Sequence, residues 1–131
     1  MITLDTSAIV ALISTSDRHH GAARGRIAES PETVVPAAIL SEVAWVVGKS
    51  VGEHGSRNFL QGVIEGSTFL DCGDGDLPRI LDLMVRFGDL HLGFSVAAVI
   101  ACAERNGGDV LTFDRHDFEF VAQDVPINLV P

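Results

Sequence analysis

Short apolar runs that alternate with longer segments of helical periodicity constrain this chain more than any other feature. The runs that we expect to form strands are residues 2–4, 33–35, 68–70, 110–112 and 127–130. The segments that we expect to form helices are a short one from Ser7, then residues 17–28, 37–47, 51–65, 77–87 and 94–106, and a helical turn over 115–121. Strands separated by helices favour an α/β fold with a central, mostly parallel sheet and helices on both faces.

Length and composition fit one domain over residues 1–131, long enough to bury a core. No apolar run reaches the roughly 18 residues of a membrane span. The opening residues, MITLDTSAIVALIS, lack a basic leader and carry an acid at position 5, so we do not expect a secretory signal. We therefore expect a cytoplasmic protein, in which Cys72 and Cys102 are buried reduced thiols.

The net charge of −9, from 9 basic and 18 acidic residues, argues against binding nucleic acid through bulk electrostatics. Neutralising phosphates requires positive charge, which this chain lacks overall. Any nucleic-acid substrate must therefore be drawn to a local site, by bound cations or by a few arginines. A basic protein partner is equally consistent with the charge.

Three acidic residues that are distant in the sequence occur where an α/β sheet gathers its reactive groups. Asp5 follows the first expected strand, Asp114 follows the run VLTF, and Glu42 lies inside the apolar segment ILSEVAWVV. Reactive groups of open α/β sheets gather beyond the carboxyl ends of the strands, so each acid could point inward at one edge. Converging carboxylates repel one another unless one is protonated or a cation lies between them. The pattern therefore predicts an oxygen-only site for Mg²⁺ or Mn²⁺, which could activate water and neutralise charge on a phosphodiester.

Each of these acids also has a plain structural interpretation. Asp5, at the head of the motif D-T-S, and Asp114 could each cap the helix that follows. Glu42 is harder to explain in this way, because a lone buried carboxylate is costly unless paired and no basic residue follows before Lys49. If the acids do meet, neighbouring hydroxyl groups could hydrogen-bond the carboxylates and hold them in place. These hydroxyl groups belong to Thr6, Ser7 and Thr112.

Taken together, these residues resemble the PIN domain, and within it the VapC toxins of bacterial toxin–antitoxin pairs. The opening MITLDTSAIVAL looks like the family's first strand with its first acid, and SEVAWVV looks like the helix that carries its glutamate. The stretch from DLHLGF to AAVIACAERNGGDVLTFDRHDF is similar to its closing half, so the resemblance covers the whole chain.

The resemblance implies a PIN-like three-layer α/β/α fold and Mg²⁺- or Mn²⁺-dependent endoribonuclease activity on RNA. It also implies a homodimer and inhibition by a cognate VapB-type antitoxin. Carried over residue by residue, Asp5, Glu42 and Asp114 are the catalytic and metal-binding acids, and Asp117 is a peripheral addition to them.

One position departs from the family pattern. Two residues after L-G-F the family places an aspartate that serves as a third acidic ligand, and this chain has Val96 there. A valine cannot coordinate a cation, and Asp89 and His91 precede the helix and need not reach the site. Three explanations remain open: a toxin inactivated by substitution, a degenerate homologue that keeps only antitoxin binding as a non-catalytic module, or a weak nuclease in which the three remaining acids still hold a metal.

Several basic and aromatic residues each have two interpretations. His19 and His20, in a segment rich in arginine, are surface residues or part of a patch that touches RNA phosphates. Arg115 lies in a solvated loop or approaches RNA. Trp45, three residues after Glu42, packs in the core or an interface or forms a wall of the site. The apolar stripe of residues 77–87 belongs to the core or forms a groove for a partner.

Overall fold

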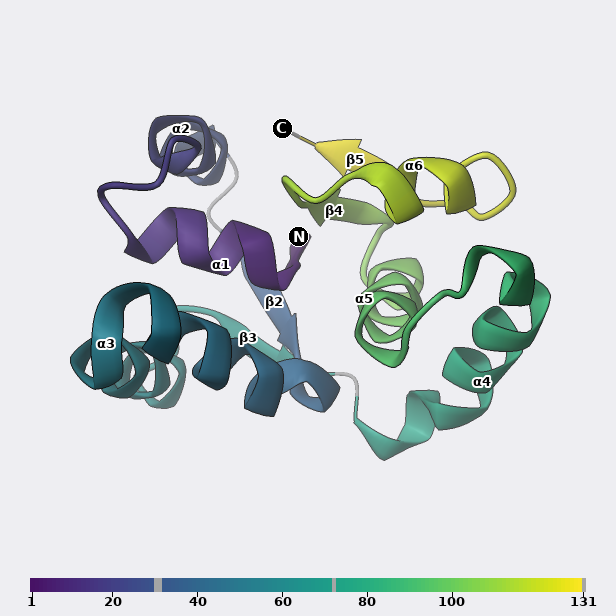
Figure 1. The fold of residues 1–131 in the computed structure, drawn as a ribbon, viewed down its shortest axis with the longest axis horizontal. Helices are drawn as coiled ribbons and strands as arrows, with labels where there is room; N and C mark the ends of the chain where they lie inside the picture. Colours follow the sequence, from purple (N-terminus) through teal and green to yellow (C-terminus); the bar gives the residue numbers. More distant parts are fainter. Residues whose placement is uncertain (30–31, 72, 131) are drawn as a thin grey trace.

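A five-stranded parallel sheet forms the centre of the chain (Figure 1). The computed structural model describes residues 1–29, 32–71 and 73–130. The strands are β1 (Ile2–Leu4), β2 (Thr33–Pro36), β3 (Phe69–Asp71), β4 (Asp109–Leu111) and β5 (Asn128–Val130), in the order β3-β2-β1-β4-β5. Every pairing is parallel. Helices flank the sheet, so the predicted PIN-like α/β/α architecture is confirmed.

Six α-helices and three short 3-10 turns connect the strands within the described residues. The helices are α1 (Thr6–Ile13), α2 (His20–Glu29), α3 (Leu40–Ile64), α4 (Leu77–Arg86), α5 (Phe94–Arg105) and α6 (His116–Val121). The turns are η1 (Ala37–Ile39), η2 (Asp74–Asp76) and η3 (Gly88–Leu90). Figure 1 shows α1, α2 and α3 on one side of the sheet and α4, α5 and α6 on the other.

Helix α5 supplies the centre of the core. All seven residues from Ala97 to Ala103 are buried, and the helix packs on β1, β2 and β4. Its small side chains allow the helix to lie close to the sheet. Gly108 then returns the chain into β4 with a φ of 90°, and a Cβ there would lie 2.9 Å from the carbonyl oxygen of Pro126. The close approach and the positive φ both require glycine at this position.

The two helices predicted over residues 37–47 and 51–65 are joined into the single element α3. Gly52 has φ 84° and ψ 173°, a backbone conformation outside the helical region, so the element is sharply kinked there. This conformation is almost restricted to glycine. Ser56 Oγ donates to the carbonyl oxygen of Ala44 at 3.1 Å, which ties the second half of α3 back to the first.

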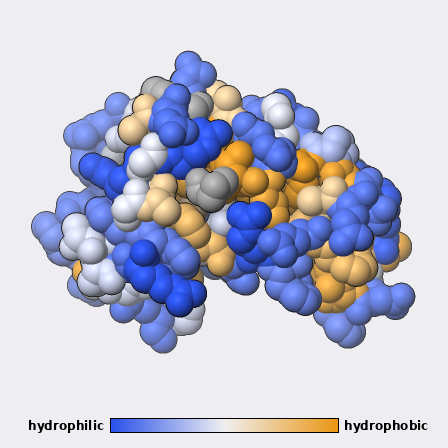
Figure 2. All heavy atoms as spheres, turned by 90° about the horizontal axis from the view of Figure 1, so that it is seen from above, coloured by the Kyte–Doolittle hydropathy of each residue, from blue (hydrophilic) through white to orange (hydrophobic). Residues whose placement is uncertain are grey.

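The apolar stripe of α4 is divided between the core and the surface. Ile80, Leu83 and the following Phe87 are buried, which confirms the core interpretation for one face of the helix. Leu81 and Val85 are 63% and 73% exposed on its other face. Seen from above, the molecular surface is mostly hydrophilic, with apolar areas between the polar ones (Figure 2).

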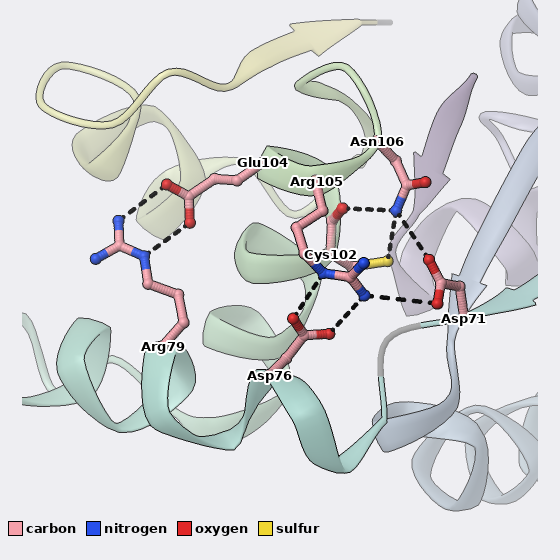
Figure 3. A network of polar contacts seen from close by, with 7 residues as sticks. All are labelled: Asp71, Asp76, Arg79, Cys102, Glu104, Arg105 and Asn106. Carbon is pink, nitrogen blue, oxygen red and sulfur yellow. Dashed lines mark hydrogen bonds and ion pairs between the residues drawn. The ribbon is translucent and has the colours of Figure 1, made fainter.

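Two arginine–carboxylate pairs fasten the end of α5 to the segment around α4 (Figure 3). Arg79 donates to both carboxylate oxygens of Glu104, each at 2.9 Å. Arg105 donates to the two oxygens of Asp76 at 2.8 and 3.0 Å. Asp76 is 5% exposed, so its charge depends on this fork-like contact for compensation.

Cys102 is buried in α5 and is disulfide-bonded. The expectation of a reduced thiol is therefore wrong for this residue, because sequence spacing does not reveal which sulfur atoms lie within bonding distance. Cys72 lies outside the described residues. In the part of the chain that the structure describes, no helix is both long and apolar enough to cross a membrane.

Candidate active site

The three acidic residues line one cavity of about 280 Å³. Asp5 directly follows β1, Asp114 follows β4, and Glu42 lies in the first turn of α3. Because β1 and β4 are paired in parallel, with Leu4 opposite Leu111, the chain leaves both strands at the same edge of the sheet. The complete lining consists of Asp5, Thr6, Ser7, Glu42, Val46, Ser95, Val96, Asp114 and Phe118.

Asp5 is held at the bottom of this site by hydroxyl groups. It is 8% exposed, and its Oδ2 accepts hydrogen bonds from Thr112 Oγ1 at 2.8 Å and Ser7 Oγ at 3.0 Å. Although Asp5 occupies the N-cap position of α1, its side chain makes no capping hydrogen bond to the next turn. The helix-cap interpretation is therefore wrong for this residue.

Burial raises the pKa of Asp5 above its ordinary value, because desolvation penalises the carboxylate, and the nearby charge of Asp114 adds to the rise. Hydrogen bonds from Thr112, Ser7 and the backbone of Thr6 oppose this rise without cancelling it. A cation bound beside Asp5 would favour its ionised form, so the site is electrostatically suited to receive positive charge.

The hydroxyl groups of Ser7 and Thr112 also join the loops after β1 and β4. Ser7 Oγ accepts from the backbone N–H of Phe113 at 2.9 Å, and Thr112 Oγ1 accepts from that of Asp114 at 3.1 Å. Asp114 is exposed and precedes Arg115, which is the N-cap of α6. Asp114 is thus not the cap of that helix, and the Thr112 contact orients its backbone at the cavity.

Glu42 is exposed rather than buried. Its carboxylate therefore carries no burial cost, contrary to the expectation from the apolar segment around it. Its Oε2 accepts a hydrogen bond from Thr6 Oγ1 at 2.9 Å, which holds the side chain beside the cavity. Sequence periodicity placed Glu42 on a helix, but the start of α3 at Leu40 leaves its first turn open to solvent.

Val96 lies in the first turn of α5 and lines the cavity, half-buried, together with Ser95. Across residues 1–29, 32–71 and 73–130, no three His, Cys, Asp or Glu side chains come close enough together to form a group that could hold a metal ion. Asp89, His91 and Asp117 do not line the cavity. Asp117 instead forms a 3.0 Å contact with the ring of its neighbour His116.

Two aromatic rings stack beside Asp114, a contact that the sequence did not indicate. The rings of His19 and Phe113 are stacked with centroids 4.3 Å apart and an interplanar angle of 8°. Arg18 Nε donates to His19 Nε2 at 3.1 Å, which ties the stacked ring to its neighbour. The alternation of the run VLTF gave no sign that its phenylalanine pairs with the distant His19.

Trp45 does not pack in the core and does not line the acidic cavity. Its side chain is 64% exposed, and it lines a second cavity of about 450 Å³ between the two halves of α3. The next residue, Val46, faces the acidic cavity. The two cavities therefore lie on neighbouring faces of the same helix.

Comparison with known proteins identifies the same architecture. A family model described as "PIN domain" matches residues 2–123. VapC20 of Mycobacterium tuberculosis, described as a Sarcin-Ricin loop cleaving toxin, superposes with a TM-score of 0.78 at 19% sequence identity, covering 95% of this chain and 96% of that one. VapBC2 of Rickettsia felis, bound to a DNA fragment from its promoter, contains a chain that superposes with a TM-score of 0.70 at 16% identity, covering 99% of this chain and 98% of that one. No curated protein matches the sequence significantly.

Proposed function

The chain belongs to the PIN-domain family, and on that premise we propose that it is a VapC-type toxin of a toxin–antitoxin pair, an endoribonuclease that requires a divalent metal. One observation carries the proposal: Asp5, Glu42 and Asp114, up to 109 positions apart, line a single cavity at the carboxyl edge of the sheet. The likeness in fold to VapC20, which is described as a toxin that cleaves the Sarcin-Ricin loop, supports the choice of RNA as substrate.

The residues around the cavity fit Mg²⁺ or Mn²⁺ in chemical kind. Mg²⁺ is commonly held by one or two carboxylates, with waters and substrate phosphate completing its shell. Asp5 and Asp114 are the two carboxylates that would hold the ion. When bound, such an ion lowers the pKa of a coordinated water and neutralises charge that develops on the phosphodiester.

The other residues of the cavity orient these acids. Thr112 and Ser7 fix Asp5 Oδ2 in one position, and the Thr112 contact to the backbone of Asp114 keeps the two aspartates in register. Thr6 holds Glu42 at the rim, where its carboxylate can accept a proton from an attacking water. The polar set thus divides into two metal-binding acids and one candidate general base.

A second candidate function is supported by Val96. This side chain brings an apolar surface to the position where the family places a further acid, and no three-residue metal group forms in the described chain. A PIN-fold protein with this cavity could retain its partner surfaces while its chemistry is weak or lost. We therefore keep, as the alternative, a non-catalytic module that only pairs with an antitoxin.

The proposal extends to assembly and location. The proposed partner is a cognate VapB-type antitoxin, and VapBC2 of Rickettsia felis is the structural neighbour that supports this pairing. We further propose that residues 1–131 form a single PIN domain, that two copies form a homodimer, and that the protein acts in the cytoplasm.

Restoring the acid at position 96 tests the nuclease proposal. The parent chain, Val96→Asp and the uncharged control Val96→Asn are incubated with a structured RNA and Mn²⁺. We expect Val96→Asp to cleave far faster than both the parent and Val96→Asn, because only the carboxylate adds negative charge beside the cation. A folded Val96→Asp chain that leaves RNA intact would refute the nuclease proposal, and equal cleavage by all three chains would show that position 96 is unimportant.

A further inference from the structure

The second cavity, which we call the Trp45 cavity, is built by the kink in α3. The reversal at Gly52 brings the two halves of the element together, and the cavity of about 450 Å³ lies between them. Its lining includes Trp45 and Lys49 from the first half and Glu53, Ser56 and Arg57 from the second. The hydrogen bond from Ser56 to the backbone of Ala44 fixes the two walls relative to each other.

The Trp45 cavity combines an open aromatic ring with positive charge. Lys49 Nζ lies 4.6 Å from the centre of the Trp45 ring, a cation–π contact, and the ring remains largely exposed. Arg57 adds a second cation. Its ion pair with Glu53, at 3.8 Å, is exposed to solvent and is therefore weak. With Glu53 counted, the lining carries one net positive charge in a chain whose net charge is −9.

An aromatic platform beside cations is the arrangement by which proteins bind single-stranded nucleic acid without reading its sequence. The location of the Trp45 cavity fits that use. Lys49 follows Glu42 by seven residues on the same helix, which is about 10 Å along the axis. A strand whose phosphates advance at least about 3.4 Å each covers that distance within a few nucleotides.

We propose that the Trp45 cavity is a subsite for one nucleotide of single-stranded RNA, whose base stacks on Trp45 and whose phosphate is held by Lys49 and Arg57. The inference rests on the proposed function, since it assumes that the strand continues into the acidic cavity. It explains how an acidic protein can hold a polyanion: the attraction is confined to two cations next to the cleavage site.

Charge argues against the other occupants of this surface. A basic antitoxin segment would meet Lys49 and Arg57 as like charges. A second copy of the chain in a symmetric dimer would bring the same patch against itself, because such interfaces are self-complementary. Lys49 and Arg57 would then face their own counterparts across the interface.

Tryptophan fluorescence tests the inference directly, since Trp45 is the only tryptophan and the chain has no tyrosine. The parent chain is titrated with an oligoadenylate of about eight nucleotides, within the usual size of such sites. EDTA is present, so that neither a bound metal nor cleavage contributes. We expect saturable quenching of the Trp45 emission. If anisotropy shows that the oligoadenylate binds, but the Trp45 emission is not quenched at the same concentrations, the inference is overturned.

Variants identify the contacts, measured by anisotropy of a labelled RNA. Trp45→Ala should weaken binding by about 5- to 150-fold, the range expected for loss of one stacked base, whereas Trp45→Phe should retain most of the affinity. Lys49→Gln and Arg57→Gln should each make the negative slope of log K against log salt shallower by about 0.7, because each removes one phosphate contact. The matched control is Arg86→Gln, because Arg86 also lies over an aromatic ring, that of Phe87 at 5.2 Å, but on α4. It should change nothing.

The remaining outcomes separate this inference from the proposed function and from other occupants. Quenching by RNA without cleavage by Val96→Asp leaves the RNA subsite in place and refutes the nuclease. Cleavage by Val96→Asp whose KM is unaffected by Trp45→Ala overturns the subsite and leaves the nuclease standing. Equal quenching by an oligoglutamate peptide, or a dimer that Trp45→Ala dissociates, would assign the cavity to a protein and overturn the inference.

Discussion

Replacing Thr112 by valine tests whether hydroxyl groups organise the acidic cavity. The side chain is fully buried, donates to Asp5 Oδ2 at 2.8 Å and accepts from the backbone of Asp114 at 3.1 Å. Valine has nearly the same shape but makes neither bond. A hydrogen bond to a charged group contributes about 1.5–3 kcal/mol, and an unsatisfied buried group costs about 1–3 kcal/mol. Since Asp114 is exposed and can turn to water, we expect a loss of about 2–4 kcal/mol in the free energy of unfolding near neutral pH.

The loss should depend on pH in a defined direction. The pKa of Asp5 is raised in the folded protein, so its contribution to stability is present at low pH and is lost as the pH rises through the folded pKa. The Thr112 bond opposes that rise, because it favours the carboxylate over the protonated acid. Thr112→Val therefore raises the pKa of Asp5 further, and its destabilisation should be larger near pH 7 than near pH 4, about where carboxyl groups ordinarily titrate.

Urea unfolding of the parent, Thr112→Val and Thr112→Ser at both pH values measures this effect. Serine keeps the hydroxyl group and loses one methyl, so it serves as the matched control. If serine and valine destabilise the protein equally, or if the loss with valine is the same at both pH values, the hydroxyl contact to Asp5 is not what holds the site together.

Three further predictions concern the frame around the site. Gly52→Ala should lower the free energy of unfolding by about 1–3 kcal/mol, because alanine is strained at φ 84°. An added Cβ would meet no atom within 4 Å, so no steric clash contributes to the loss. Urea unfolding that shows no loss would contradict this prediction. Arg105→Gln should lower the free energy of unfolding by about 1–3 kcal/mol, since it removes the cation beside the buried Asp76, although Arg105 itself is half exposed. Adding Asp76→Asn should recover part of that loss. Strictly additive losses in the double variant would argue against the pair. Reducing the disulfide at Cys102 should lower the free energy of unfolding by about 2–4 kcal/mol, and identical melting with and without reductant would argue against its contribution.

The sequence predicted that Asp5 and Asp114 lie at the same edge of the sheet, because both residues come after strands. Asp5 and Asp114 each follow a short apolar run, and in a parallel sheet such positions face the same edge. Glu42 was singled out because it lies inside an apolar helical segment, and the resemblance to the PIN domain then implied the same role; its exposure removes the first of these two reasons. These three acids, which line one cavity, were thus accessible from local patterns together with family likeness.

The features that the sequence missed depend on contacts between distant segments. Periodicity indicated one helix on each side of Gly52. It did not indicate the sharp kink at Gly52 or the exposure of the Trp45 side chain. The disulfide at Cys102 and the stacking of His19 on Phe113 each require a distance between side chains that spacing along the chain does not contain. The exposure of Glu42 has the same origin, since it depends on what packs against the first turn of α3.

Direct titration with Mn²⁺ is the most decisive measurement of the central claim, that Asp5 and Asp114, which follow two separate strands, hold one divalent ion beside Glu42. Calorimetry would compare the parent chain with Asp5→Asn and Asp114→Asn, which keep size and remove one charge each, and with Val96→Asp. We expect one weak site in the parent, its loss in both asparagine variants, and a marked gain in affinity with Val96→Asp. Unchanged Mn²⁺ binding in Asp5→Asn and Asp114→Asn would contradict the account, because the ion would then be held elsewhere.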